Sequence, residues 1–370
     1  MTDHVTKLLF ISVRADLGGG PEHLMQLTSA LGSRVEAYIA CPDEEPYATR
    51  YSSLPNATVL PLLPHRQFTL TAVFTLLGII KKKEIQIIHS HGKGAGAYSR
   101  ILGLLSKTPV IHTFHGVHVG SYNALKRAAY CLYEQAQGAL TKKIIAVSAG
   151  ERMELVEHLG ITSSKICVIE NGVEGSSNPK ISIGSFRSPL RVLNANRFDF
   201  QKNPEDIFSI AKEVKKRALP VRITVIGTGE RLEEFRRLVV DEELQPYIDL
   251  HGGTDKPREI MRESDVFLST SRWEGMPLAL LEAMSEGLVL VASNVTGNKD
   301  ILEQGPAGLL FDLHDIDTAV QHLSWIIDNP SEASDLGARG PNVIESHYSI
   351  EAMAEKTHAL YLEVITNSRK

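Results

Sequence analysis

The chain has little cysteine and no strong excess of charge of either sign. Its three cysteines, Cys41, Cys131 and Cys167, are far apart and fit neither a disulfide framework nor a zinc-finger spacing, which indicates a reducing compartment. Lys and Arg number 39 and Asp and Glu number 44, so the formal net charge is −5. This balance argues against a nucleic-acid-binding protein, which needs a basic surface for the phosphate backbone.

Long hydrophobic runs are also missing. The longest, residues 68–80, covers about 13 positions, whereas a helix needs roughly 20 to cross a bilayer. The N-terminal segment carries Asp3 and leads directly into an apolar strand, so we do not identify a signal peptide there. We therefore expect a cytoplasmic protein.

At 370 residues, with 43% hydrophobic and 22% charged residues, the chain is long enough for two domains and too apolar for disorder. Short β-branched runs alternate with amphipathic helical patterns, which is typical of parallel sheets covered by helices. Strands are predicted at residues 7–13, 35–40, 57–62, 85–90, 109–114, 143–148, 165–170, 190–197, 221–227, 248–252, 265–271 and 288–293. Helices are predicted from near Pro21, over 69–83, after Gly94, Ser121 and Ser148, and over 203–218, 230–241, 256–263, 277–286, 315–328, 331–346 and 349–366.

A segment rich in Ser, Gly and Pro, residues 176–188, separates two such series and is the predicted linker. The expected domains are residues 1–175 and 189–348, each a doubly wound, Rossmann-like α/β domain. The final helix carries an apolar stripe that needs a buried partner, formed by Met353, Leu360, Tyr361 and Val364. Ligands of doubly wound sheets lie beyond the carboxyl ends of the strands, so the motifs at these ends are candidate site residues.

The most informative motif begins at a strand end and runs through Glu274 and Pro277 into a helix that contains Glu282. Pro277 is expected at the first helical position, where the helix N-terminus and free backbone amides form an anion site. The predicted nucleotide-binding residues of this turn are Gly275, Met276, Pro277, Leu278 and Ala279. Two carboxylates beside such a turn suit a ligand with a phosphate in its middle and hydroxyl groups at both ends. The alternative is a solvated acidic helix face, which the apolar residues of the same helix disfavour.

Two further motifs offer groups for a diphosphate. Arg197 and Lys202 follow the first strand of the second domain and are predicted to neutralise phosphate oxygens, Arg as a fork and Lys as a point charge. Gly18, Gly19 and Gly20 open a helix and allow the backbone to approach a phosphate or a sugar. A solvated basic loop and a plain turn are the respective alternatives.

Histidines gather at two predicted strand ends, His89 and His91 at one and His112, His115 and His118 at the next. His115 precedes a glycine at the carboxyl end of its strand and is the candidate site residue. We expect no metal there, because neither Asp, Glu nor Cys lies nearby in the sequence to complete a ligand set.

Lesser signals occur in the second domain. Gly227 ends one strand and is expected to approach the nucleotide, and Gly253 follows the next strand and is expected to line the base. Gly297 and Asn298 fit either a turn on the donor side or a plain loop.

The segment from Glu274 to Glu282 resembles the E-x7-E signature of the retaining GT-B glycosyltransferases of family 4, and the resemblance can be followed from Gly18 to the last helix. It implies that Glu274 faces the donor sugar and that Glu282 holds the ribose hydroxyls. It also implies that the glycine loop lies near the donor diphosphate and that His115 hydrogen-bonds the sugar hydroxyls. The family's Gly-Arg-Leu and Lys-Gly motifs keep both of their charges here as Arg197 and Lys202.

The resemblance implies a GT-B fold, in which two Rossmann-like domains face each other across a cleft and the C-terminal helix, residues 349–370, packs on the first domain. The implied enzyme is a hexosyltransferase that moves a sugar, with retention, from a nucleotide-sugar (UDP-sugar) donor to a hydroxyl of a glycan or lipid-linked acceptor. Bacterial cell-surface polysaccharide or glycolipid biosynthesis is the expected setting. No metal cofactor is expected, because no Asp-x-Asp pair stands in a cleft loop: Asp315 and Asp317 lie at a helix start.

Other functions remain open from the sequence. A nucleotide-sugar epimerase of the same fold would convert one UDP-sugar into another without an acceptor. A Rossmann oxidoreductase is disfavoured because the Gly-x-Gly-x-x-Gly fingerprint is missing, and a non-catalytic subunit is disfavoured because the charged residues are intact. The apolar run before Lys81, and the helix with Lys126 and Arg127, fit either peripheral contact with the inner leaflet or solvated helix faces.

Overall fold

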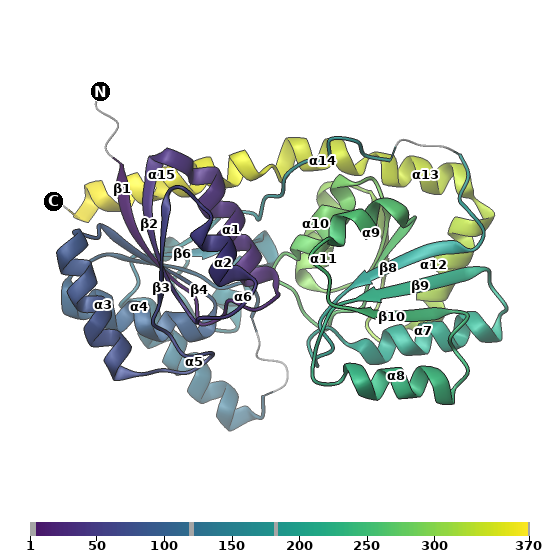
Figure 1. Ribbon diagram of the computed structural model, residues 1–370, viewed down its shortest axis with the longest axis horizontal. Helices are drawn as coiled ribbons and strands as arrows, with labels where there is room; N and C mark the ends of the chain where they lie inside the picture. The colour runs from purple at the N-terminus through teal and green to yellow at the C-terminus, as the bar shows by residue number, and fades with distance from the viewer. Residues whose placement is uncertain (1–4, 118–121, 181–183, 369–370) are drawn as a thin grey trace. The chain divides into compact units, whose positions relative to one another are not determined.

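The structure is a computed structural model and describes residues 5–117, 122–180 and 184–368. The chain divides into two compact units (Figure 1). The first unit comprises residues 1–171 together with 350–370, and the second comprises residues 172–349.

The first unit is built on a parallel sheet of seven strands in the order β3-β2-β1-β4-β5-β6-β7. Its strands are β1 (Thr6–Ile11), β2 (Val35–Cys41), β3 (Ala57–Pro61), β4 (Ile87–His91), β5 (Val110–Thr113), β6 (Lys143–Ala146) and β7 (Ile166–Val168). Its helices are α1 (Gly19–Leu31), α2 (Tyr47–Ser52), α3 (Leu70–Lys83), α4 (Lys93–Ser106), α5 (Ala124–Ala139), α6 (Ala149–Glu157) and α15 (Ile350–Ser368), with short 3-10 turns at Gly32–Arg34 and Ser163–Lys165.

Successive side chains of β1 point to opposite faces of this sheet, and helices cover both faces. Leu8 and Phe10 pack with α1, α2 and α15 in one cluster, whereas Leu9 and Ile11 pack with α3 and α4 in another. Both faces are therefore dry, which explains why the strands read as continuous apolar runs in the sequence.

Helix α15 returns to the first unit, as the resemblance implies. It runs beside α1, the yellow helix next to the purple one in Figure 1, and its apolar stripe joins the core of that unit. Leu360 is 6% exposed and Tyr361 is fully buried. The predicted stripe is confirmed, and its burial removes from water an apolar face that would otherwise lack a partner.

The second unit is built on a six-stranded parallel sheet in the order β10-β9-β8-β11-β12-β13. Its strands are β8 (Leu190–Ala195), β9 (Val221–Ile226), β10 (Ile248–Gly252), β11 (Val266–Ser269), β12 (Val289–Ser293) and β13 (Gly308–Phe311). Its helices are α7 (Pro204–Lys216), α8 (Leu232–Asp241), α9 (Pro257–Glu263), α10 (Leu278–Ser285), α11 (Thr296–Gln304), α12 (Ile316–Asp328), α13 (Pro330–Ala338) and α14 (Gly340–His347).

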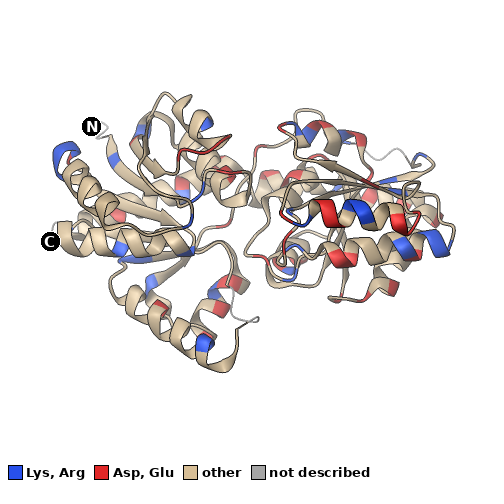
Figure 2. Ribbon diagram, turned by 60° about the horizontal axis from the view of Figure 1, so that its bottom comes forward, with Lys and Arg blue, Asp and Glu red and all other residues tan. Residues whose placement is uncertain are grey.

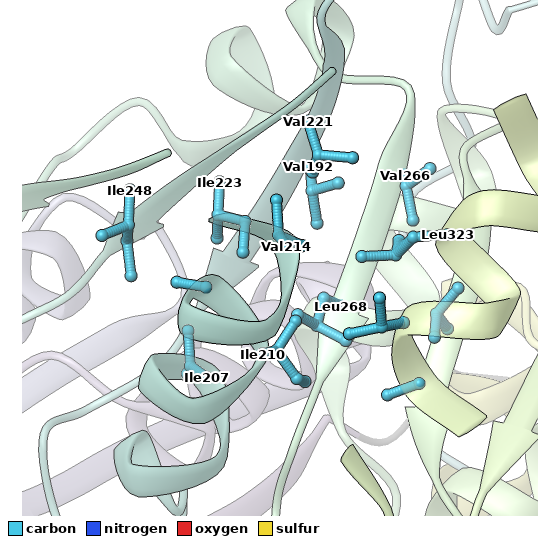
Figure 3. Packing of buried hydrophobic residues seen from close by; sticks show 14 of the residues in the cluster. Val192, Ile207, Ile210, Val214, Val221, Ile223, Ile248, Val266, Leu268 and Leu323 are labelled. Carbon is cyan, nitrogen blue, oxygen red and sulfur yellow. The ribbon is translucent and has the colours of Figure 1, made fainter. Parts of the chain in front are cut away.

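β-branched residues form the core on one face of the second sheet. Figure 3 shows Ile207, Ile210 and Val214 of α7 beneath strand residues such as Val192, with Leu323 of α12 beside them. Branched side chains suit this position because they pack closely on a pleated surface and have few rotamers to lose.

Each sheet contains one point at which the strand order reverses, between β1 and β4 in the first and between β8 and β11 in the second. The loops that leave adjacent strands at such a point diverge to opposite faces, and the opening between them is where ligands bind in doubly wound folds. The predicted glycine loop follows β1 and His91 ends β4. The loop that carries Arg197 and Lys202, called the cation loop below, follows β8, and Glu274 follows β11.

The segment predicted as a linker between the domains belongs to the second unit in the structure. Its described residues, 176–180 and 184–188, are counted with the second unit, and the division falls at residue 171. Ser176 donates a hydrogen bond to the Glu286 carboxylate at 2.6 Å, and the Lys180 amide donates to the Glu286 carbonyl at 2.9 Å. Although its composition is typical of a flexible loop, this segment is held to the second unit by specific hydrogen bonds.

Two helix predictions need correction. The single helix predicted at 331–346 is two helices, α13 and α14, because Pro341 has no N–H to continue the hydrogen bonding of α13 and stands in the first turn of α14. Helix α2, at Tyr47–Ser52, was not predicted, because six residues are too few to display a helical period.

We predict that Leu360→Ala lowers the melting temperature and that Leu362→Ala does not. Truncation of the buried Leu360 side chain leaves a cavity and should lower the free energy of unfolding by about 2–5 kcal/mol. The same truncation at Leu362, which is 46% exposed on the same helix, should change that free energy by no more than about 0.5 kcal/mol. Calorimetric melting of the two variants tests this. Equal melting temperatures for both would contradict the burial of Leu360 in the core of the first unit.

Candidate active site

The loop after β8 brings two cations together through one carboxylate. Asp199 accepts a hydrogen bond from Arg197 Nε at 2.8 Å with one oxygen and from the Lys202 backbone amide at 3.1 Å with the other. Asp199 thus closes a turn that holds both cationic residues at the carboxyl end of the strand. The basic pair could be found in the sequence, but the role of Asp199 could not.

Lys202 and Glu274 form an ion pair across the reversal point of the second sheet. Lys202 Nζ lies 2.5 Å from Glu274 Oε1, and the two side chains are only 16% and 8% exposed. A charge-assisted hydrogen bond with so little water around it is strong and directional. The carboxylate takes one of the three ammonium protons, so Lys202 keeps two donors for another oxygen ligand.

The turn after Glu274 leads into the N-terminus of α10, and the predicted start of this helix needs one correction. Pro277 is the N-cap of α10 and not its first residue, with an extended ψ of 118°, and the helix begins at Leu278. The first N–H groups of a helix have no acceptor within it and carry partial positive charge. Glu282 lies one turn further along, half-buried on this short helix.

Helix α11 supports this turn from behind. The Gly297 amide donates to the Glu274 carbonyl at 3.3 Å, and Ser293 Oγ donates to the Ser271 carbonyl at 2.7 Å. A Cβ on Gly297 would lie 2.5 Å from the Gly275 carbonyl oxygen. Gly297 is therefore neither a separate turn nor a plain loop, because it is the second residue of α11 and packs directly against the turn after Glu274.

Gly227 supports the cation loop in a similar way. Its φ is 142°, and a Cβ at this position would collide with the Asn196 carbonyl oxygen, one residue before Arg197. Gly253 follows β10, the edge strand of the sheet, and is exposed. The structure therefore places Gly227 beside Arg197 and places Gly253 two strands away from β8.

In the first unit the glycine loop opens α1, as predicted. Gly18 is its N-cap, and a Cβ built on Gly19 or Gly20 would meet no atom within 4 Å. The backbone here borders open space, which an incoming oxygen ligand can approach closely.

His115 has an unusual backbone conformation, which contacts from helix α6 support. Its φ is 65°, in the left-handed region that a residue with a Cβ rarely adopts. The buried carboxylate of Glu151 accepts hydrogen bonds from the amides of Gly116 and Val147, and Ser148 caps α6 by accepting from the Glu151 amide. Glu151 therefore belongs to the N-terminal cap of α6 and also fixes the loop that carries His115.

Three imidazoles meet at this edge of the first sheet. His23 comes from α1, His91 ends β4, and His115 follows β5. His91 Nδ1 lies 3.2 Å from His115 Nε2, and the ring centroids of His23 and His115 are 4.7 Å apart. Burial lowers the pKa of His23 to about 4 and holds the pKa values of His91 and His115 well below their usual range, so all three rings are neutral.

The other predicted histidines have structural roles or lie outside the described residues. His89 bonds Tyr361 of α15 at 2.7 Å and Thr113 at 2.9 Å, and His112 bonds Ser90 at 2.8 Å inside the sheet. His118 belongs to residues 118–121, which the structure does not describe.

Two family profiles match the chain. "Glycosyl transferases group 1" matches residues 180–343 and "Glycosyltransferase Family 4" matches residues 17–176. The chain belongs to the family 4 glycosyltransferases. The first profile covers the cation loop and both candidate carboxylates, and the second covers the glycine loop and His115.

Solved structures place this glycosyltransferase in the GT-B fold. The structure of Anabaena HepE in complex with UDP-glucose superposes with a TM-score of 0.82 at 16% identity over 97% of this chain and 99% of that one. Sucrose-phosphate synthase of Thermosynechococcus elongatus superposes with a TM-score of 0.83 at 18% identity, over 98% and 100% of the two chains.

Curated relatives are glycosyltransferases as well. An Escherichia coli protein named UDP-Gal:alpha-D-GlcNAc-diphosphoundecaprenol alpha-1,3-galactosyltransferase is 29% identical over 313 residues, 80% of either chain. The E. coli O-antigen biosynthesis glycosyltransferase WbnH is 24% identical over 92% of this chain and 96% of its own.

Each half of the glycosyltransferase thus assembles part of the predicted set. The second unit brings Arg197, Lys202 and Glu274 together at one strand edge, with the α10 N-terminus following Glu274. The first unit brings His115 to the edge where the glycine loop lies. Sequence reasoning did not connect Glu151 or His23 with His115, because each lies far from it in the chain.

We predict that Gly227→Ala weakens the binding of nucleoside diphosphates at least about tenfold. The new Cβ would displace the backbone of the cation loop, and a loss of about 1.4 kcal/mol of binding free energy is enough for a tenfold change in affinity. Gly78→Ala is the matched control, because a Cβ there meets no atom within 4 Å and sits in helix α3. Calorimetric titration with UDP and GDP measures both. Unchanged affinity in a folded Gly227 variant would separate Gly227 from the nucleotide site.

Proposed function

We propose that this glycosyltransferase transfers a hexose from a UDP-sugar to an acceptor hydroxyl, with retention at the anomeric carbon and without a metal cofactor. The observation that carries the proposal is the shielded Lys202–Glu274 pair beside the α10 N-terminus, at the reversal point of the second sheet. The choice of donor is supported by one relative, whose name specifies UDP-Gal, and by the similar HepE structure, which is a complex with UDP-glucose.

Departure of the nucleoside diphosphate is the step that needs stabilisation. Negative charge grows on the leaving phosphate as the glycosidic bond breaks, and donors already in place stabilise that charge at little reorganisation cost. In the proposal, the Arg197 guanidinium donates two parallel hydrogen bonds to the diphosphate. Lys202 donates to it with the two ammonium protons that are not bonded to Glu274. Backbone amides between Gly275 and Ala279 donate the remaining hydrogen bonds. Gly18, Gly19 and Gly20 are assigned to the same diphosphate.

The carboxylates and His115 are assigned to the hydroxyl groups. Glu274 is mostly shielded from water and held by Lys202, so its oxygens are directed for the donor sugar. Glu282 is half-buried one turn inside α10 and is assigned to the ribose. His115, neutral and fixed by the Glu151 contact to Gly116, both donates and accepts hydrogen bonds and is assigned to the sugar hydroxyls.

The acceptor is proposed to be a glycan or a lipid-linked glycan of the bacterial cell surface, approached by peripheral contact with the inner leaflet. Among the described residues, no helix is long and apolar enough to span a bilayer. In the ribbon of Figure 2, charged residues are frequent on the helices of the second unit, whereas helices of the first carry long stretches without charged residues. On α5, Leu125 and Leu132 are 82% and 70% exposed and Lys126 and Arg127 lie near its start, a combination that suits an anionic membrane surface.

We predict that the two carboxylates separate donor binding from turnover. Glu282→Ala should weaken UDP binding by roughly 10–100-fold, because a hydrogen bond to a charged group contributes about 1.5–3 kcal/mol. Glu274→Gln keeps an amide oxygen that accepts from Lys202, so it should leave UDP affinity unchanged while lowering kcat by roughly 10²–10³. Glu303→Ala, which removes a 63% exposed carboxylate on α11, is the control for both measurements.

Calorimetry with UDP and initial rates with UDP-sugars measure these effects. UDP affinity that survives in Glu282→Ala would overturn the ribose assignment. Conversion of one UDP-sugar into another without an acceptor would overturn the transfer itself in favour of an epimerase.

We predict that transfer continues in EDTA and depends on the cation loop. Arg197→Ala and Lys202→Ala should each lower the rate by roughly 10²–10³, the loss typical of a missing donor to a developing anion. Lys212→Ala on α7, whose side chain pairs with Glu242 and is 44% exposed, should have no effect. Activity lost in EDTA and restored by Mg²⁺ or Mn²⁺ would contradict a metal-free mechanism.

A further inference from the structure

The imidazoles of His23, His91 and His115 point toward one another at the carboxyl edge of the first sheet. One ring nitrogen from each lies within 4.8 Å of the corresponding nitrogens of the other two. His91 Nδ1 and His115 Nε2 are 3.2 Å apart and share a hydrogen bond, which an ion can replace once the N–H proton moves to the other nitrogen of its ring. Two ligands of a tetrahedral zinc ion, with Zn–N bonds of about 2.0–2.1 Å, are separated by about 3.3 Å, so this pair already has the spacing of ligands on one ion.

The protein's own groups do not satisfy the cluster. Two ring nitrogens of the cluster, His23 Nδ1 and His91 Nε2, are buried and have no hydrogen-bond partner among the described residues. A buried polar atom of this kind costs free energy unless a water or an ion meets it. Imidazole nitrogens are common ligands of zinc-type ions, and each of the three side chains offers one to the cluster.

The surrounding side chains hold the rings in place. The His89 ring lies 4.3 Å from that of His91, centroid to centroid, and both of its nitrogens are engaged by Tyr361 and Thr113. His89 is therefore a support and not a ligand. Glu151 fixes the backbone beside His115 through the Gly116 amide. Metal sites depend on such outer contacts to orient their ligands.

We propose that His23, His91 and His115 form a binding site for a divalent transition-metal ion of the Zn²⁺ type. Three imidazoles favour Zn²⁺, Co²⁺, Ni²⁺ or Cu²⁺ over Mg²⁺ and Ca²⁺, which prefer oxygen ligands. Three protein ligands leave a fourth position for water or another small oxygen ligand. This site was not expected from the sequence, because His23 lies on α1, far along the chain from the other two.

The site has a consequence for activity that rests on the proposed function. If His115 hydrogen-bonds the sugar, an ion on its ring nitrogen withdraws it from that role. Zn²⁺ then inhibits transfer and a chelator restores it, so the metal acts against the reaction and does not support it. Metal binding by itself does not depend on this assignment.

The binding test uses the full chain after removal of metals, titrated with Co²⁺ and followed by visible absorption. We expect one equivalent of Co²⁺ to produce the intense ligand-field bands of a four-coordinate ion, and Zn²⁺ to abolish them. His23→Gln and His91→Gln should each weaken Co²⁺ binding by at least about tenfold, since even losses in the outer shell cost that much. His158→Gln, an exposed histidine next to Cys131, is the matched control and should bind Co²⁺ as the parent does.

A second measurement needs no variant. In the unaltered protein, the ¹⁵N ring resonances of three buried histidines should shift together on addition of one equivalent of Zn²⁺ and stay unchanged with Mg²⁺. Absence of four-coordinate bands, bands that His158→Gln removes, or shifts confined to exposed histidines would each overturn the site. Zn²⁺ binding without inhibition would leave the site standing and count against the role of His115 in the proposed function.

Discussion

The reversal of strand order in each sheet is the constraint on which the rest of this glycosyltransferase depends. All strands within a sheet are parallel, so every strand delivers its following loop to the same edge. At the reversal points the two neighbouring loops diverge, and room for a ligand opens without any hole in the core. The glycine loop and His91 border one such point, and the cation loop and Glu274 border the other.

The two edges differ in their electrostatics. The second unit concentrates full charges, with Asp199 placing Arg197 and Lys202 and with Glu274 paired to Lys202 under little solvent. Burying an ion pair contributes little to stability once desolvation is counted, so its presence at this edge points to function. The first unit gathers neutral imidazoles, which hydrogen-bond hydroxyl groups or hold a soft cation but contribute no net charge.

Helix α15 connects the end of the chain to the chemistry of the first unit. Its apolar stripe completes the core beneath α1, and Tyr361 reaches from it to His89 inside the sheet. His89 in turn packs against His91. The last helix therefore both covers apolar surface and stiffens the strand that carries a site residue.

The sequence by itself determined the helices and strands and much of the candidate site, because both depend on patterns of neighbouring residues. Apolar periodicity gave strands and helices close to their observed bounds, and the spacing of Glu274 and Glu282 around a glycine and a proline marked the helix start. The stripe on the last helix could be assigned for the same reason. A short helix such as α2 escaped because its pattern is shorter than the period that would reveal it.

Only the tertiary structure decided which distant side chains meet. Glu151 holds the loop after His115, His23 joins His91 and His115, and Ser176 and Lys180 tie the supposed linker to the second unit. None of these contacts has a period or a spacing in the sequence, because strand order and helix packing bring the partners together. Local sequence preferences determine which segments form helices and strands. Burial of both faces of each sheet then determines which of these elements pack against one another.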